Sequence, residues 1–140
     1  MAARPSKNSK ITILLAEDEA PLRNLLQTIF EKAGFTVLAA ENGQQAAHLA
    51  DGHEGAIDLL VSNVQMPHMT GPDLAKSLMQ MRPGLRVLLI SAYPQGLLML
   101  DNGWSFLQKP FLPKAIVDKI YTMMASPPGQ GATRVKQCLR

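Results

Sequence analysis

Short continuous runs of apolar residues alternate along the chain with stretches in which apolar and polar residues recur at helical spacing. Short apolar runs rich in β-branched residues are typical of strands that are buried on both faces of a sheet. Strands are therefore predicted over residues 11–16, 36–40, 59–62 and 87–90 and, as a short fifth strand, over residues 105–107.

Helices are predicted between these strands. Pro21 suits a first helical turn, and apolar residues then follow at i, i+3, i+4, i+7 and i+8 until Gly34 ends the helix. Further helices are predicted over residues 43–50, 71–81 and 113–124. Before the fifth strand, only residues 95–100 can form a helix, and they make barely more than one turn.

Five alternations of strand and helix indicate a parallel sheet with right-handed crossovers and helices on both faces. In such α/β folds, ligands bind outside the carboxyl ends of the strands. The residues that follow each strand are therefore the first place to look for a functional site.

Composition excludes several classes of protein. The chain has 140 residues, which is the size of one domain. No apolar stretch approaches the ~20 residues that span a membrane. Its one cysteine, Cys138, cannot build a disulfide framework, so a cytoplasmic location is expected.

The net charge of +3 is unevenly distributed. Residues 1–10 and 126–140 carry six basic and no acidic side chains, so the remaining chain carries 8 basic and 11 acidic residues. A mildly acidic body argues against a nucleic-acid-binding face. We expect a basic disordered tail over residues 1–9, one folded domain over 10–125 and a second basic disordered tail over 126–140.

Polar side chains with distinct chemistry follow four of the predicted strands. They are two carboxylates, an amide, a hydroxyl and an ammonium: Glu17, Asp18, Asn63, Ser91 and Lys109. Each has a simpler interpretation by itself, since acids cap helices and lysines lie on surfaces. Their joint placement at one edge of the sheet favours a shared site.

Four segments carry a resemblance to a known family. ILLAEDEAPLRNLL, DLLVSNVQMPHMTG, LLISAY and FLQKPF resemble the receiver domains of bacterial response regulators, and the last is similar to receivers attached to hybrid histidine kinases. The resemblance covers about residues 10–125. It implies a flavodoxin-like (βα)5 three-layer α/β sandwich with sheet order 2-1-3-4-5, here with a shortened fourth helix.

The resemblance also implies roles for particular residues. In the family, an aspartate that ends the third strand attacks a phosphoryl group, and Mg²⁺ bridges the transferring group. The implied metal ligands are Glu17, Asp18, Asn63 and the carbonyl of Gln65. The implied phosphoryl-contact and switch residues are Ser91, Lys109 and the aromatic Phe106.

The central residue departs from the family pattern, because Asn63 stands at the phosphoacceptor position. A neutral amide cannot form a stable acyl phosphate. Two acids instead of three then face the lysine, so Mg²⁺ binding is expected to be weakened, although the amide oxygen can still be a ligand. Asp58 is no substitute, because it precedes the third strand and lies at the opposite end of the sheet.

The shortened fourth helix alters the surface that the family uses for partners. We expect an apolar partner surface there, formed by Leu97, Leu98, Met99, Leu100 and Trp104. The alternative is that these side chains close the core beneath a shortened loop.

These observations favour a stand-alone receiver-like signalling protein of a two-component phosphorelay. It would not be an enzyme or be phosphorylated at Asn63, and it would act by contact with a histidine kinase or another signalling protein, with a homodimer left open. One alternative is a conventional receiver whose aspartate has been changed to asparagine at position 63. A small flavodoxin-like enzyme or nucleotide binder fits less well, because no glycine-rich phosphate loop is present.

Overall fold

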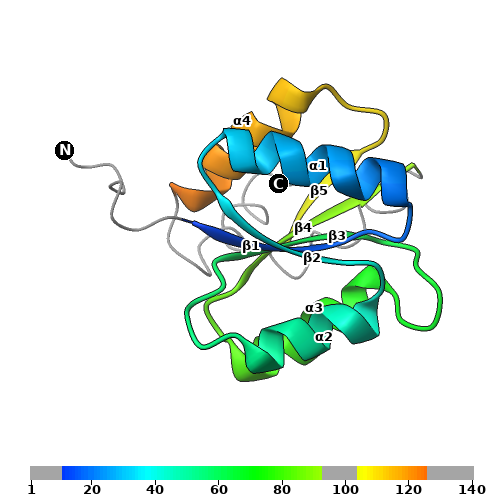
Figure 1. Ribbon diagram of the computed structural model, residues 1–140, viewed down its shortest axis with the longest axis vertical. Helices are drawn as coiled ribbons and strands as arrows, with labels where there is room; N and C mark the ends of the chain where they lie inside the picture. The colour runs from blue at the N-terminus through cyan, green and yellow to red at the C-terminus, as the bar shows by residue number, and fades with distance from the viewer. Residues whose placement is uncertain (1–10, 93–103, 126–140) are drawn as a thin grey trace, which may run out of the picture.

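The computed structural model describes residues 11–92 and 104–125. Strands and helices alternate along the described chain from β1 to β4, as Figure 1 shows. In chain order the elements are β1 (Thr12–Ala16), α1 (Ala20–Lys32), β2 (Thr36–Ala40), α2 (Gly43–Gly52), β3 (Leu59–Asn63), α3 (Gly71–Met81), β4 (Arg86–Ser91), β5 (Ser105–Gln108) and α4 (Pro113–Met124). The helix predicted over residues 95–100 lies outside the described residues.

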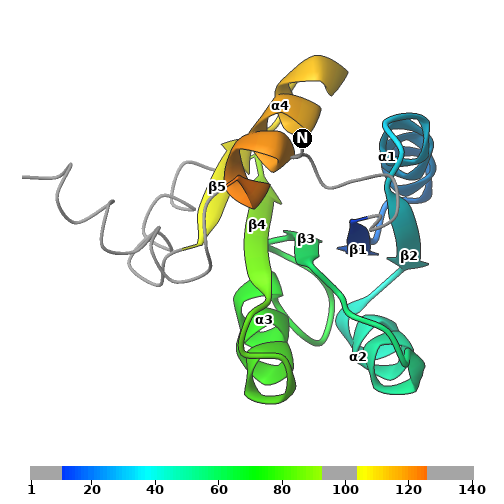
Figure 2. The same cartoon turned by 90° about the vertical axis from the view of Figure 1, so that its left-hand side faces the viewer.

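The strands form one parallel sheet in the order β2-β1-β3-β4-β5. Helices α1 and α4 cover one face, and α2 and α3 cover the other, as both ribbon views show (Figures 1 and 2). This arrangement confirms the predicted three-layer fold and its strand order.

Two apolar clusters, one on each face of the sheet, hold the layers together. Leu14, Leu60 and Leu89 belong to the cluster beneath α2 and α3, whereas Ile13 and Leu88 belong to the cluster beneath α1 and α4. Successive strand residues point to opposite faces. Because both faces of the sheet are covered, the strand sequences are continuous apolar runs and do not alternate between apolar and polar residues.

Side chains near the helix ends fix where the helices begin and end. The Asn42 side chain accepts the backbone N–H of Gln45 at 2.7 Å before α2, and the Thr70 hydroxyl accepts that of Asp73 at 3.2 Å before α3. Gly34 follows α1 with a φ of 97°, a conformation that favours glycine.

The Arg82 guanidinium ties the end of α3 to the end of α2. It donates to three backbone carbonyls, those of Ala50, His53 and Gly55, at 3.0 to 3.1 Å. These carbonyls lie at and beyond the last turn of α2, where carbonyl groups lack the intrahelical N–H partners of the helix interior.

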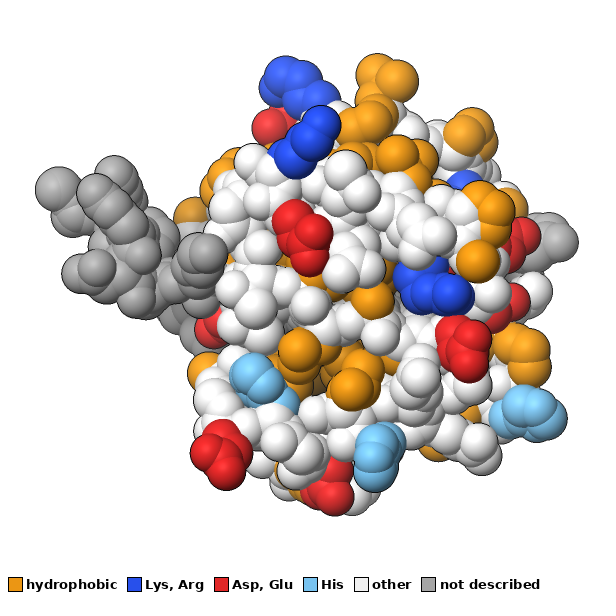
Figure 3. Space-filling view, in the orientation of Figure 1, with side chains coloured by type: hydrophobic (Ala, Val, Ile, Leu, Met, Phe, Trp, Pro, Cys, Tyr) orange, Lys and Arg blue, Asp and Glu red, His pale blue; other side chains and the backbone are white. Residues whose placement is uncertain are grey.

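On the face drawn in Figure 3, acidic and basic side chains are interspersed among uncharged surface. In the described part of the chain, each helix is too short or too polar to cross a membrane.

Candidate functional site

The carboxyl ends of β1, β3, β4 and β5 bring the predicted site residues to one edge of the sheet. Backbone hydrogen bonds hold the residues that follow these strands. The N–H of Glu17 donates to Ala40 at 3.1 Å, and the N–H of Lys109 donates to Ser91 at 2.8 Å. The sheet therefore fixes the backbone from which the functional side chains project.

Glu17 is fully buried and lies beside Lys109. Its Oε1 is 3.4 Å from the Lys109 Nζ, and its Oε2 accepts the backbone N–H of Glu19 at 3.1 Å. Burial raises the pKa of the Glu17 carboxyl above its ordinary value, and the Asp18 carboxyl adds to this rise. The Glu19 N–H and the Lys109 ammonium oppose it.

The Asn63 carboxamide connects two loops at this edge. Its Nδ2 donates to the Asp18 Oδ1 at 3.1 Å and to the Gln65 carbonyl oxygen at 3.0 Å. Asp18 belongs to the loop after β1, and Gln65 belongs to the loop after β3. The amide nitrogen therefore points at two oxygens that the family resemblance assigns to a metal ion.

The start of α3 packs directly against the backbone of Asn63. A Cβ at Gly71 would lie 2.4 Å from the Asn63 carbonyl oxygen and 3.0 Å from the Ser62 hydroxyl. The Ser62 hydroxyl donates to that same carbonyl at 2.9 Å, and the Gly71 N–H donates to Val64 at 2.8 Å. Glycine is therefore required where α3 begins.

Ser91 and Phe106 lie on neighbouring strands. Phe106 is in register with Leu89, which points to the same face of the sheet as Ser91 two residues later. Ser91 is buried, and Phe106 packs against the cluster beneath α2 and α3. This placement suits the switch role assigned to the two residues, which stays a prediction.

The oxygen atoms at this edge do not form a ready cation site. Among residues 11–92 and 104–125, no group of three or more His, Cys, Asp or Glu side chains could hold a metal. Glu17 is buried and engaged with Lys109. Asn63 presents its nitrogen, which is not a ligand for Mg²⁺, toward Asp18 and Gln65.

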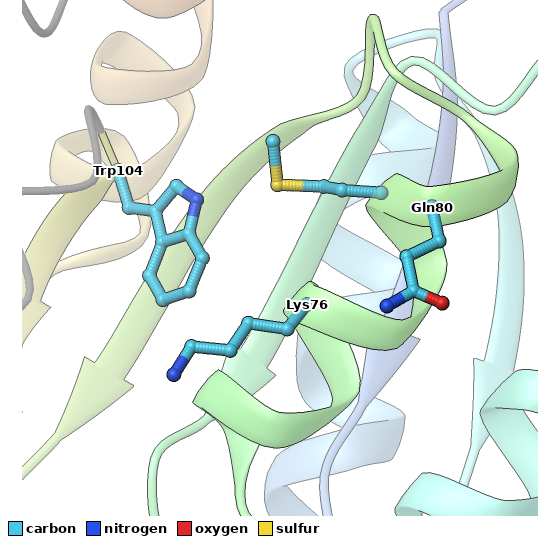
Figure 4. A pocket seen from close by; sticks show the side chains of 4 residues that line it. Lys76, Gln80 and Trp104 are labelled. Atoms are coloured by element: carbon cyan, nitrogen blue, oxygen red, sulfur yellow. The ribbon is translucent and has the colours of Figure 1, made fainter.

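Trp104 corrects part of the predicted partner surface. It is only 5% exposed and belongs to the cluster beneath α2 and α3. This position agrees with the alternative interpretation, in which the side chain closes the core. Its indole lies opposite Lys76 and Gln80 of α3 across a hollow of about 280 Å³ (Figure 4). The remainder of that surface, Leu97 to Leu100, lies outside the described residues.

An apolar groove beside the site was missed by the sequence reasoning. It has a volume of about 230 Å³ and runs between α1 and the segment around Pro110. Lys109 lines the groove, as does Leu25, which is 52% exposed. In the sequence, the signal for this groove is the helical spacing of Leu22 and Leu25.

The fold and the residues at its carboxyl edge define a signalling domain of the flavodoxin-like class. The family model of the response regulator receiver domain matches residues 13–121 of the sequence. The chain therefore belongs to the receiver-domain family. Receiver domains are the signalling modules of two-component systems. The resemblance found in the sequence is thereby confirmed.

Two relatives from Brucella abortus illustrate the similarity. The chain is 32% identical over 117 residues to sensor kinase CckA, with 81% of this chain but only 12% of that protein covered. It is also 32% identical over 116 residues to the response regulator receiver protein CpdR, where 80% of this chain and 95% of that protein are covered.

Solved structures agree with this assignment. The receiver domain of the hybrid histidine kinase CckA superposes with a TM-score of 0.69 at 32% identity, covering 79% of this chain and 96% of that one. The response regulator TrrA from Thermotoga maritima, solved in complex with Mg²⁺-BeF, gives a TM-score of 0.70 at 24% identity. It covers 80% of this chain and 97% of its own and shows the fold alone.

Proposed function

We propose that this chain is a receiver-like module that signals by protein contact and does not take up phosphate at Asn63. The observation that carries the proposal is the carboxamide at the end of β3, hydrogen-bonded to Asp18 beside the Glu17–Lys109 pair. By the family motif, this is the place of the phosphoacceptor. The domain would therefore not be an enzyme that forms a phosphoryl intermediate at this position.

The chemistry of the side chain supports this proposal. A receiver needs a carboxylate oxygen that attacks the phosphorus atom and keeps the phosphoryl group as an acyl phosphate. An amide has no anionic oxygen, and its nitrogen lone pair is delocalised into the carbonyl. Asn63 therefore lacks the nucleophile, while Lys109 and Ser91 remain at the neighbouring strand ends.

Without phosphorylation, a switch has no ligand that favours one of its states. An equilibrium between conformations moves only when a ligand binds the two states differently. The domain would then offer one standing surface to a histidine kinase or another signalling protein. The proposed partner surface is the segment Leu97–Leu100 with helix α4. Trp104 is left out of this surface because its side chain is buried. Stand-alone action, the absence of a nucleic-acid partner and a cytoplasmic location stay predictions from the sequence.

A conventional receiver that carries an Asp-to-Asn change at position 63 is the second candidate. It is favoured by the intact surroundings, since the acidic pair, the hydroxyl and the lysine are all in place at one edge. The two candidates differ in whether asparagine or aspartate is the native residue at position 63, and therefore in whether the native protein is phosphorylated there.

The test is incubation of the protein with acetyl phosphate and Mg²⁺, followed by intact-mass measurement. We expect no added phosphate on the chain with Asn63 and stoichiometric, hydroxylamine-sensitive phosphate on Asn63→Asp. Phosphate on Asn63 itself would overturn the proposal. An inert Asn63→Asp variant would show that more than the nucleophile has been lost and would argue against the second candidate.

A further inference from the structure

We infer that the Asn63 amide nitrogen takes the place of the divalent cation and joins the two site loops without metal. The inference rests on the proposed function in one respect, the placement of Asn63 at the phosphoacceptor position. It adds that the site is closed to Mg²⁺ by its own side chain.

The geometry of the two hydrogen bonds carries this inference. Nδ2 of Asn63 lies 3.1 Å from the Asp18 Oδ1 and 3.0 Å from the Gln65 carbonyl oxygen. The amide has two N–H donors, and both of these neighbours are pure acceptors. The nitrogen therefore donates to one acceptor on each loop.

A cation at the same place would overlap with this nitrogen. Mg²⁺ requires oxygen ligands at about 2.0–2.1 Å in near-octahedral geometry and gives up water reluctantly. An ion bound to both the Asp18 and Gln65 oxygens would lie in the space between them, where Nδ2 now sits. Binding would require the carboxamide to turn over and both hydrogen bonds to break.

The charges around Asn63 favour the closed arrangement. The family resemblance assigns two carboxylates to this site, those of Glu17 and Asp18, and Glu17 is already paired with Lys109. A single exposed carboxylate with two neutral oxygens is a weak ligand set for a hard divalent ion. The positive end of the amide dipole faces the Asp18 carboxylate and donates a hydrogen bond to it.

The same two bonds connect the β1–α1 and β3–α3 loops. Since Asp18 and Gln65 lie 47 residues apart in the chain, the amide acts as a crosslink between distant segments. In this inference the loops hold their relative positions whether or not Mg²⁺ is present. The surface they support would then be independent of the metal.

The first experiment uses the full ¹⁵N-labelled chain titrated with MgCl₂. We expect the Asn63 side-chain NH₂ signals to stay unchanged, with no binding heat by calorimetry and no rise in the unfolding midpoint. A saturable shift of these signals at about 1 mM free Mg²⁺, within the weak range of oxygen-ligand sites, would overturn the inference.

Two substitutions at position 63 distinguish the effect of a negative charge from the loss of the two hydrogen bonds between the loops. Asn63→Asp should have a lower unfolding midpoint in EDTA, recover on addition of Mg²⁺ and show a saturable binding heat for Mg²⁺ that the Asn63 chain does not show. Asn63→Ala should also lose stability, but without a response to Mg²⁺, and hydrogen exchange of the two loops should accelerate. Unchanged loop protection in Asn63→Ala would contradict the crosslink.

Asn24→Asp is the matched control, because it makes the same chemical change at an exposed position of α1. It should show no response to Mg²⁺. If Asn63→Asp fails to fold, the titration of the Asn63 chain and the Asn63→Ala variant still decide. Mg²⁺ binding without phosphate uptake would overturn this inference alone, whereas phosphate on Asn63 would overturn the proposed function.

Discussion

The Nζ of Lys109 lies 3.4 Å from the Oε1 of Glu17, a carboxyl with no exposure to solvent. We expect Lys109→Met to destabilise the domain by about 2 kcal/mol at pH 7, because a buried carboxylate loses its partner. This value is below the usual range for a buried pair, since the lysine side chain is 19% exposed and the carboxyl can protonate. Urea denaturation measures the change.

The destabilisation by Lys109→Met should shrink as pH falls from 7 toward 4.5, the ordinary pKa of the carboxyl. The folded-state pKa of Glu17 is raised, so the folded protein binds the proton more tightly than the unfolded chain. Stability linked to this group is therefore gained as pH falls and lost as it rises.

Lys114→Met is the control, because its pair with Asp118 is exposed and should contribute little. Equal effects of the two substitutions would contradict the special burial of Glu17.

Gly71→Ala should destabilise the domain by about 2 kcal/mol, because the added methyl group would overlap with the Asn63 carbonyl and push α3 from β3. Thermal unfolding measures the loss, and the Asn63 side-chain NMR signals should move with it. Gly52→Ala has open space around its Cβ and should be neutral or stabilising. A tolerated Gly71→Ala with unmoved signals would show that α3 does not fix Asn63.

Trp104→Ala should cost about 3–5 kcal/mol, as expected for a large core side chain. Trp104→Phe should cost less than about 1 kcal/mol, because it also removes an indole N–H that is buried and unpaired among the described residues. Urea unfolding followed by circular dichroism avoids dependence on tryptophan fluorescence. A small effect of Trp104→Ala would return this residue to the partner surface.

Leu98→Ser and Met99→Ser should each weaken capture of the partner histidine kinase while leaving the domain folded, if this segment is the contact surface. Pull-down with the kinase and circular dichroism of each variant give the two readouts. Leu25→Ser tests the groove between α1 and Lys109 in parallel. Loss of binding only in Leu25→Ser would move the contact to that groove, and unfolding of Leu98→Ser would place the segment in the core.

The sequence alone determined the order of elements and the edge at which the polar residues meet. Continuous apolar runs such as residues 59–62 indicate strands covered on both faces, and helical spacing indicates the layers that cover them. The predicted bounds of α3 and α4 match the observed bounds to the residue, and both helices have a proline in their first turn. Parallel topology then placed Asn63 and Lys109 at one edge without any side-chain coordinates.

Tertiary structure alone decided what those side chains do to one another. The burial of Glu17 depends on layers from distant parts of the chain, and so does the core position of Trp104. The direction of the Asn63 amide is set by Asp18 and Gln65 together. Local patterns report periodicity along the backbone, whereas hydrogen bonds and desolvation depend on neighbours brought together only by folding.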